Sequence, residues 1–501
     1  MSSSPEIQKA NLAYGFAKEW GLVMLEEQGS VEAIHIGVRP GVRREALLEV
    51  RRVLDAPIVL SELTHAEFDK SLSAAYASNG LESSADAITE QGNLYSLAED
   101  IPQTEDLLDS DDDAPVIRMI NGLIQEAIKL RASDIHIEPH DKRLSVRFRV
   151  DGTLREVLSL SANLAGVLVS RIKVMARLDI AKKRVPQDGR FSLTLGAQAI
   201  DVRVSTLPSK YGERAVLRLL SKEQALFGVK ELGMTGDMTL AFTNALATPN
   251  GIILVTGPTG SGKTTTLYAG LSMLNDASRN ILTVEDPIEY ALDGIGQTQV
   301  NNKVGMTFAA GLRAILRQDP DVVMVGEIRD PETAEIAVQA SLTGHLVLST
   351  VHTNSAVAAI TRLRDMGIER FLLASTVTAI VAQRLVRRLC NDCKTPYTPD
   401  NTELRLLGLS GKHTFYHPKG CESCHGIGYT GRVGLYEMVV MDDNLRAMIH
   451  DGAREQDMAA YAFKASDTLM QSGARHVSEG TASAEEVMRV CRETGQKKSS
   501  R

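Results

Sequence analysis

The chain has 501 residues, of which 43% are hydrophobic and 24% are charged, and its formal net charge at pH 7 is −8. This length suffices for about three to four domains, each with an ordinary hydrophobic core. The acidic balance argues against a general nucleic-acid binder, a class that is usually basic, although it is compatible with a local basic surface.

No apolar run reaches the ~20 residues of a membrane span, and the N-terminus lacks the basic and apolar segments of an export signal. We therefore expect a cytoplasmic protein that associates with a membrane only through partners. The 5 cysteines of so long a chain favour a metal site over a disulfide framework.

Residues 1–105 are predicted to form a small N-terminal α/β docking domain. Apolar residues such as Leu12, Phe16 and Trp20 recur there at helical spacing, which indicates a face directed at a core rather than an exposed binding stripe. The acidic run at 106–113 predicts an extended linker, because like charges repel. The alternative is a solvated loop within one domain.

Residues 114–230 predict an α+β, PAS-like domain. It begins with a helix from Ala114 to Arg131. One face of that helix is expected to carry Ile117, Ile120, Ile124, Ala127 and Ile128.

The strand patterns of the same domain carry arginines on one face. In the segment 144–150, apolar residues alternate with Arg147 and Arg149, and the dipeptide at 151–152 is Asp-Gly, which predicts a hairpin turn. Two later strands carry Arg203 and Arg218. Because a guanidinium matches the geometry of phosphate oxygens, these two arginines are candidates for sensing the γ-phosphate of a nucleotide. The alternative is an exposed strand position.

The most specific motif lies between an apolar strand pattern at 251–256 and a helical pattern at 264–274. It consists of Gly257, Pro258, Thr259, Gly260, Ser261, Gly262, Lys263, Thr264 and Thr265. This order is that of a phosphate-binding loop, whose backbone N–H groups cradle an anion at the start of a helix. Lys263 is expected to reach the β- and γ-phosphates, and the hydroxyl of Thr264 to hold Mg²⁺. We therefore predict a RecA-like P-loop ATPase core at 231–386.

Three further apolar runs in this core end in polar residues, namely Glu285, Glu327 and His352. Ligands bind at the carboxyl ends of the strands of an open parallel sheet, so these side chains are expected to face the phosphates. Glu327 is expected to polarise water or to support Mg²⁺, and Glu285 is the other candidate general base. His352 and His345 are candidates for sensing the γ-phosphate. For each residue the alternative is a purely structural role.

A helix expected at 308–317 places Arg313 and Arg317 on one face. From that face either arginine can act as a finger on the ATP of a neighbouring subunit, and Arg329 is a further candidate. The alternative is a solvated helix face, where such charges contribute little.

Two C-x-x-C pairs, Cys390 with Cys393 and Cys421 with Cys424, form the clearest metal-binding pattern. Four thiolates on two tight turns complete a tetrahedral site without an open position. The sequence therefore predicts a structural Zn²⁺ in a tetracysteine module at 387–430, followed by a helical region at 431–501. Covalent haem at the second pair would leave the first pair unexplained. Cys491 is predicted to be an ordinary thiol.

Together these motifs resemble those of the secretion-superfamily ATPases. The resemblance covers the phosphate loop, an Asp box at 283–290, a glutamate motif at 325–330 and a His box at 343–354. Within the superfamily the chain resembles the type II (general) secretion ATPases of the protein E family. The tetracysteine insertion is shared with pilus-assembly ATPases and absent from retraction ATPases, and the short N-terminal region with Tyr14 to Lys18 is more like protein E.

The resemblance implies a homohexamer that hydrolyses ATP with Mg²⁺, held at the inner membrane. Its N-terminal domain would bind the cytoplasmic part of membrane protein L, and the motor would act on membrane protein F to drive pseudopilus assembly and protein export across the outer membrane. By position, the five arginines match the family pattern: Arg203, Arg218, Arg313, Arg317 and Arg329.

Three alternatives remain open at this point. A type IV pilus-assembly motor would use the same chemistry on another cargo. A DNA-handling ATPase is disfavoured by the acidic balance and by an aromatic content of 4%, since stacking grooves need aromatic residues. A nucleotide-gated scaffold without useful turnover is disfavoured by the intact Lys263, Glu285 and Glu327.

Overall fold

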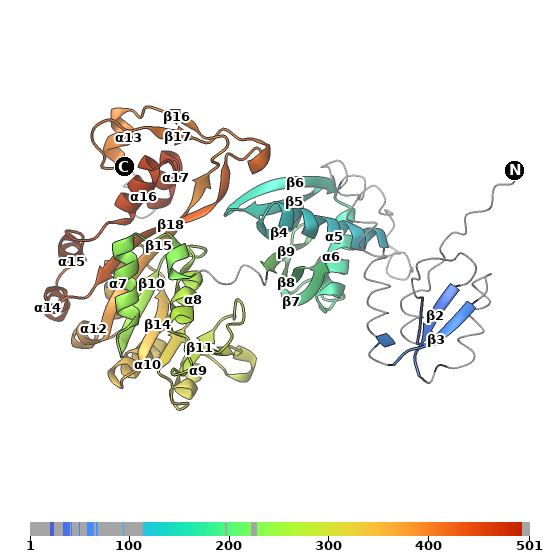
Figure 1. Cartoon of the computed structure of the whole chain (residues 1–501), viewed down its shortest axis with the longest axis horizontal. Helices are drawn as coiled ribbons and strands as arrows, with labels where there is room; N and C mark the ends of the chain where they lie inside the picture. Colours follow the sequence, from blue (N-terminus) through green and yellow to red (C-terminus); the bar gives the residue numbers. More distant parts are fainter. Residues whose placement is uncertain are drawn as a thin grey trace. The chain divides into compact units, whose positions relative to one another are not determined.

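The computed structural model describes residues 21–24, 34–40, 42, 50, 58–64, 67–68, 94, 114–195, 198–221 and 228–492 (Figure 1). The predicted stripe from Leu12 to Trp20 and the predicted acidic linker at 106–113 lie outside these residues. The chain forms two compact units. The first comprises most residues up to 218, and the second comprises residues 219–501 with the short segments 130–134 and 148–155. None of the described helices is long and apolar enough to cross a membrane.

The first unit begins with a three-stranded sheet. Its strands, in spatial order, are β1 (Leu22–Met24), β2 (Ile34–Val38) and β3 (Ile58–Glu62). β1 is antiparallel to β2, whereas β2 and β3 are parallel. Leu22, Ile36 and Val50 form a small core beside it.

A six-stranded sheet with two helices follows. In spatial order the strands are β6 (Thr153–Ser161), β5 (Arg143–Val150), β4 (Ala132–Pro139), β9 (Gly212–Ser221), β8 (Gln198–Ser209) and β7 (Gln187–Leu195), and the helices are α5 (Ala114–Lys129) and α6 (Leu164–Met175). The alternation predicted for β5 is confirmed, since Leu144, Val146 and Phe148 are fully buried. The hairpin is also confirmed: Asp151 and Gly152 have φ values of 48° and 85°.

The helix predicted from Ala114 is present as α5, but its buried stripe differs from the predicted face. The buried residues are Val116, Met119, Ile120, Leu123, Ile124 and Ala127, each at most 2% exposed. Ile117 and Ile128, which the sequence placed on that face, are only half-buried. The sequence offers two overlapping apolar faces, and packing against α6 and the sheet selects one of them.

The second unit is built on a seven-stranded sheet. In spatial order its strands are β12 (Gly296–Gln299), β11 (Ile281–Glu285), β13 (Val322–Val325), β14 (Leu346–Val351), β10 (Gly251–Thr256), β15 (Val377–Leu389) and β18 (Tyr429–Val440). Neighbouring strands from β12 to β15 are parallel, and β18 is antiparallel to β15.

Alternate side chains of these strands pack into two hydrophobic cores, one on each face of the sheet. Ile253 and Val255 of β10 belong to the core under η2 (Val229–Leu232), α7 (Gly236–Leu246) and α8 (Lys263–Leu274). Ile252 and Leu254 belong to the opposite core, which includes α9 (Phe308–Ile315), α10 (Pro331–Leu342), α11 (Ala356–Asp365) and α12 (Arg370–Thr376). Burial on both faces explains why β10 is apolar from Ile252 to Val255.

Between β15 and β18 the chain forms a small module, and the residues described after β18, up to 492, form four helices (Figure 1). The module contains β16 (Thr395–Tyr397), α13 (Asn401–Leu406), β17 (Phe415–His417) and η4 (Glu422–Cys424), and the helices are α14 (Asp443–Asp451), α15 (Glu455–Ala462), α16 (Leu469–Ser478) and α17 (Ala484–Arg492). The prediction of a helical region from 431 was wrong for its first residues, which belong to β18. These residues form a strand because they pair with β15, and that pairing is seen only in the folded chain.

Candidate active site

The phosphate-binding loop lies between the end of β10 and the start of α8, so the strand and the helix predicted around it are confirmed. Gly257 has a φ of 150°, and a Cβ atom there would lie 2.4 Å from the carbonyl oxygen of Gln383. Only glycine therefore lets the loop pass this close to β15. Lys263 folds back over the loop, and its Nζ donates to the carbonyl oxygens of Gly257 at 2.9 Å and Pro258 at 3.1 Å.

The pKa of the Lys263 ammonium group lies closer to neutral pH than that of an ordinary lysine. Burial lowers the pKa of Lys263 from an ordinary 10.5 to about 8; the carboxylate of Glu327 opposes this effect, and the guanidinium of Arg384 reinforces it. The group is therefore mostly charged at pH 7. A phosphate bound beside it would favour the charged form further.

Glu327, Arg329 and His352 meet at the edge where β13 and β14 end. These strands are parallel neighbours, so the residues that follow them emerge at the same edge of the sheet. Glu327 forms an ion pair with Arg329, and its Oε2 lies 3.3 Å from Nε2 of His352. Burial and the charge of Lys263 lower the pKa of His352, which keeps its imidazole neutral at pH 7.

Glu285 lies at the end of β11 and is buried, with both carboxylate oxygens engaged. Its Oε1 accepts hydrogen bonds from Oγ1 of Thr283 at 2.6 Å and Nε2 of Gln297 at 3.1 Å. Its Oε2 accepts a hydrogen bond from the hydroxyl of Tyr268 on α8. These contacts anchor β11 to α8 and to β12, and a proton-accepting role would require one of them to break.

The predicted arginines occupy several elements. Arg313 lies on α9 and forms a half-exposed ion pair of 2.7 Å with Glu332. α9 ends at Ile315, so the helix predicted to reach residue 317 was too long. Arg317 lies beyond the helix and donates from Nη1 to the carbonyl oxygen of Arg313 at 3.0 Å.

Arg203 and Arg218 lie on β8 and β9 of the six-stranded sheet, in the other unit. On the same sheet, Arg147 and Arg214 both form ion pairs with the buried carboxylate of Glu138 on β4. The predicted arginine-bearing face is therefore partly neutralised within the sheet.

Of the two candidate histidines, His345 lies away from this edge. It precedes β14, whereas His352 follows it, so the two rings lie at opposite ends of a strand roughly 20 Å long. The Nδ1 of His345 lies 2.9 Å from the carbonyl oxygen of Ala340 at the end of α10, which indicates a structural contact.

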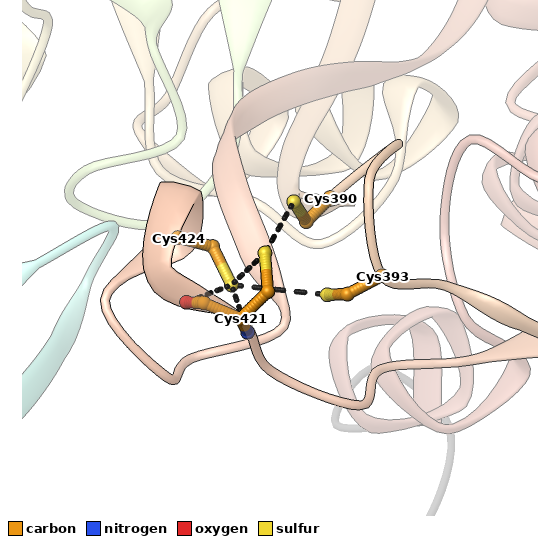
Figure 2. A group of neighbouring side chains, drawn as sticks. All are labelled: Cys390, Cys393, Cys421 and Cys424. Atoms are coloured by element: carbon orange, nitrogen blue, oxygen red, sulfur yellow. Dashed lines mark hydrogen bonds between the residues drawn. The ribbon is translucent and has the colours of Figure 1, made fainter.

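The four predicted cysteines converge, and their Sγ atoms all lie within 4.8 Å of one another (Figure 2). The Sγ distance is 3.8 Å from Cys390 to Cys421 and 3.8 Å from Cys393 to Cys424. Burial alone would raise the pKa of Cys424, but the backbone N–H groups of Cys421 and Gly428 donate to its sulfur and lower that pKa to about 6. Cys424 therefore favours the thiolate, the form that binds metal, whereas burial raises the pKa of Cys393 to about 11.

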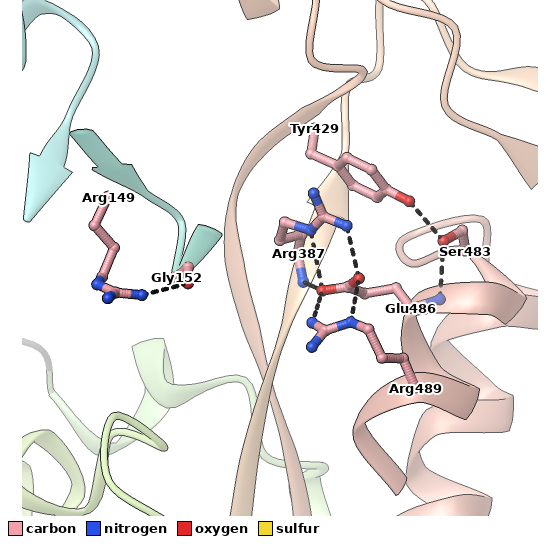
Figure 3. A network of polar contacts seen from close by, with 7 residues as sticks. All are labelled: Arg149, Gly152, Arg387, Tyr429, Ser483, Glu486 and Arg489. Atoms are coloured by element: carbon pink, nitrogen blue, oxygen red, sulfur yellow. Dashed lines mark hydrogen bonds and ion pairs between the residues drawn. The ribbon is translucent and has the colours of Figure 1, made fainter. Parts of the chain in front are cut away.

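The two strands that lead into and out of this module are tied to α17 by a polar network centred on Glu486 (Figure 3). The buried carboxylate of Glu486 accepts from Nη2 of Arg387 on β15 and from Nη2 of Arg489 on α17, both at 2.8 Å. The guanidinium of Arg387 stacks over the ring of Tyr429 at the start of β18, whose hydroxyl lies 2.9 Å from Oγ of Ser483. The network therefore holds α17 on both strands.

Sequence reasoning missed three buried polar residues near the site: Gln383 and Arg384 on β15, and Glu437 on β18, each at most 4% exposed. The available signal was a glutamine and an arginine that directly follow the apolar run 379–382. Such residues are buried only when the fold supplies partners for them.

Comparisons with known proteins agree with this geometry. Residues 109–489 match the family model described as type II/IV secretion system protein, and residues 11–76 match a model described as a domain of GSPII protein E. The chain is 54% identical over 497 residues to the type II secretion system protein E of Pseudomonas aeruginosa, with 98% of each chain covered. It is 54% identical over 488 residues to the type II secretion system ATPase E of Vibrio cholerae, covering 96% of this chain and 97% of the relative.

Solved structures show the same architecture. The pilus retraction motor PilT, with ADP bound, is 28% identical with a TM-score of 0.52, covering 73% of this chain and 95% of that one. The ATPase DotB of Yersinia pseudotuberculosis, at 21% identity, shares the fold with a TM-score of 0.57, covering 78% of this chain and 95% of that one. The predicted α/β class, with a RecA-like core preceded by an α+β domain, is confirmed. The chain belongs to the type II secretion system protein E family and is a secretion ATPase.

Proposed function

We propose that this ATPase is the motor of a type II secretion system, in which ATP hydrolysis drives pseudopilus assembly and protein export across the outer membrane. The observation that carries the proposal is the convergence of Lys263, Glu327 and His352 beside the phosphate loop, in a chain whose curated relatives are named for type II secretion. A type IV pilus-assembly motor would use the same site. The match of residues 11–76 to a domain described for protein E favours type II secretion over that alternative.

In this proposal the loop from Gly257 to Thr265 binds the triphosphate through its backbone N–H groups. Lys263 leaves its carbonyl contacts and pairs with the β- and γ-phosphates, which is a short movement because its Nζ already lies over the loop. The hydroxyl of Thr264 and the carboxylate of Glu327 are oxygen donors of the kind that suits Mg²⁺. When bound, Mg²⁺ would neutralise charge that develops on the phosphates.

Of the two candidate general bases, Glu327 fits the role better. Its carboxylate contacts Arg329 and His352 at the open edge of the sheet, whereas Glu285 is held on both oxygens by residues of its own core. We assign to Glu327 the orientation of the attacking water, and to His352 the orientation of Glu327. Glu285 then shapes the site by fixing α8 against β11.

The arginines complete the site by stabilising charge on the transferred phosphoryl group. Arg329 already contacts Glu327, and Arg313 and Arg317 lie exposed at the end of α9, a position from which a finger can reach another subunit. We propose that Arg203 and Arg218 of the six-stranded sheet contribute to the same stabilisation. This assignment requires a ring, for which we propose a homohexamer.

The cysteine module fits a structural Zn²⁺. A tetrahedral S₄ site with Zn–S bonds of about 2.3 Å has sulfur–sulfur edges of about 3.8 Å. The Sγ separations of 3.7 and 3.8 Å among these cysteines have that length. Cys390, Cys393, Cys421 and Cys424 would supply all four ligands, so the metal would have no open position for catalysis.

We further propose that the protein acts in the cytoplasm, peripherally at the inner membrane. Its N-terminal domain would bind the cytoplasmic part of membrane protein L, and the motor would act on membrane protein F. The match of residues 11–76 to a protein E domain supports the first contact. No nucleic-acid partner is proposed.

The test is phosphate release by the full chain, measured alone and with the cytoplasmic domain of protein L, together with the molecular mass in solution. We expect stimulation by protein L, a hexameric mass, and loss of turnover with retained ATP binding in Glu327→Gln. Equal stimulation by a pilus platform protein would favour pilus assembly. Stimulation by DNA would contradict the proposal.

A further inference from the structure

The loop that carries His352 is held in place by a buried arginine. This loop, residues 352–355, links β14 to α11. Arg384 of β15 donates from Nη2 to the carbonyl oxygen of Asn354 at 3.1 Å and to its Oδ1 at 3.3 Å. The same guanidinium lies against the phosphate loop, because a Cβ atom on Gly257 would come within 3.1 Å of its Nη1.

The other end of the same loop rests on Glu437. One carboxylate oxygen of Glu437, Oε1, accepts from the backbone N–H of Ala356, the first residue of α11, at 2.8 Å. The other, Oε2, accepts from the N–H of Leu469, the first residue of α16, at 3.2 Å. A single buried carboxyl group therefore caps two helices at once; burial raises its pKa, and the two backbone N–H groups and the charge of Arg384 oppose that effect.

These contacts lie beside a cavity. Asn354, Ser355, Glu437 and Leu469 line a cavity of about 600 Å³ beside the loop. Where the loop borders this cavity, the contacts from Arg384 and Glu437 fix its position. At its start, Thr353 is tied to the end of β10 by a hydrogen bond from its N–H to Oγ1 of Thr256 at 2.9 Å.

We propose that Glu437 is a positioning residue for ATP hydrolysis, which sets the place of the 352–355 loop and thereby holds His352 against Glu327. Glu437 does not touch the nucleotide in this proposal; it acts through the start of α11. The inference rests on the role proposed above for His352, and it adds a residue from β18 to the catalytic edge.

The test is a double-mutant cycle in the full chain, with phosphate release measured across ATP concentrations. Glu437→Gln keeps the side-chain volume but replaces one acceptor with a donor that faces a backbone N–H. We expect kcat to fall about tenfold or more, with KM changed less than about twofold, because misplacement affects chemistry more than binding. In a His352→Ala background the same change should lower kcat less than about twofold, since the group it positions is gone.

Two matched controls separate positioning from general damage. Glu455 lines the same cavity but contacts only Oγ1 of Thr361 among the contacts described for its side chain, so Glu455→Gln should leave kcat unchanged. Glu486→Gln removes a buried carboxylate of the Arg387 network, and any effect on kcat should be the same with and without His352. If Glu437→Gln does not fold, Glu437→Asp, which is too short to reach both helices, takes its place in the cycle.

The outcomes distinguish the two proposals. If His352→Ala lowers kcat and the effect of Glu437→Gln is undiminished in that background, Glu437 does not act through His352 and the inference is overturned. The same holds if Glu437→Gln leaves kcat unchanged. If His352→Ala itself has no effect, the role proposed for His352 fails and the inference fails with it.

Discussion

The phosphate-binding edge and the cysteine module both place backbone N–H groups at negative charge, on phosphate in the first and on cysteine sulfur in the second, but they assemble their sites differently. In the module, all four sulfurs come from two short turns, and the N–H groups of Gly420, Cys421 and Gly428 donate to sulfur from the same turns. The edge combines residues at or just beyond the ends of β10, β11, β13 and β14 with support from β15 and β18. Loss of one ligand is therefore enough to disrupt the cysteine site. The phosphate-binding edge can also be perturbed by substitutions on β15 and β18, which are far from it in the sequence.

The largest expected effect is on ATP hydrolysis at the phosphate-binding edge. Lys263→Ala removes the only side-chain cation of the phosphate loop, so phosphate release should fall on the order of 10²- to 10³-fold. The metal content of the module should be unchanged, which serves as the internal control. Secretion that persists in cells carrying this variant would contradict the motor proposal.

Loss of a single cysteine ligand should weaken zinc binding by the module without changing ATP binding at the phosphate-binding edge. Cys390→Ser leaves three thiolates, so the purified protein should lose its zinc to a chelator, as measured by elemental analysis. Cys491→Ser is the matched control, because Cys491 is buried beside α16 and contacts the carbonyl oxygen of Leu469 rather than the cluster. ATP affinity should be the same in both variants, and an equal metal content in all proteins would refute the zinc assignment.

The Glu486 network tests whether the module is supported from outside. Glu486→Gln leaves two arginines without their buried partner, which should cost about 3 kcal/mol of local stability. Hydrogen exchange of the α17 amides would measure it, with the neighbouring exposed Glu485→Gln as the control. Unchanged protection of α17 would show that the network is dispensable.

The same network should make the C-terminal region sensitive to acid. Although burial alone would raise the pKa of Glu486, hydrogen bonds from Arg387 and Arg489 lower it from 4.5 to about 2. A carboxyl with a depressed pKa contributes stability that is present above pH 4.5 and is lost as the pH falls toward 2. The protection factors of the α17 amides, which correct for the intrinsic pH dependence of exchange, should fall over that range in the wild type and less so in Glu486→Gln.

The smallest effect is the pH dependence of nucleotide binding. The pKa of Lys263 is about 8 before phosphate binds, so the protein must take up a proton to bind ATP above that pH. Affinity should be flat below pH 8 and fall by up to about tenfold per unit above it. Lys263→Arg should show no such fall, because a guanidinium does not titrate in this range. Titration calorimetry with a non-hydrolysable analogue would measure both.

Much of the site could be predicted because its residues sit at strand ends. The sequence alone shows an apolar run followed by a glutamate or a histidine. Because β13 and β14 are parallel neighbours, Glu327 and His352 then lie together. The same reasoning placed Glu285 among the catalytic residues, but the sequence carries no sign that Tyr268 and Gln297 occupy its oxygens. His345 was a candidate for a similar reason, and its position before the strand excludes it.

The amino-acid sequence by itself determined the phosphate loop, the four thiols and the apolar strands, because each depends on neighbouring residues or on a period of two. Only the tertiary structure decided which face of α5 is buried, that residues 429–440 form a strand, and that Arg384 and Glu437 reach the loop after β14. Those outcomes depend on contacts with residues far along the chain. The sequence around a residue does not show which distant residue it will pack against or hydrogen-bond.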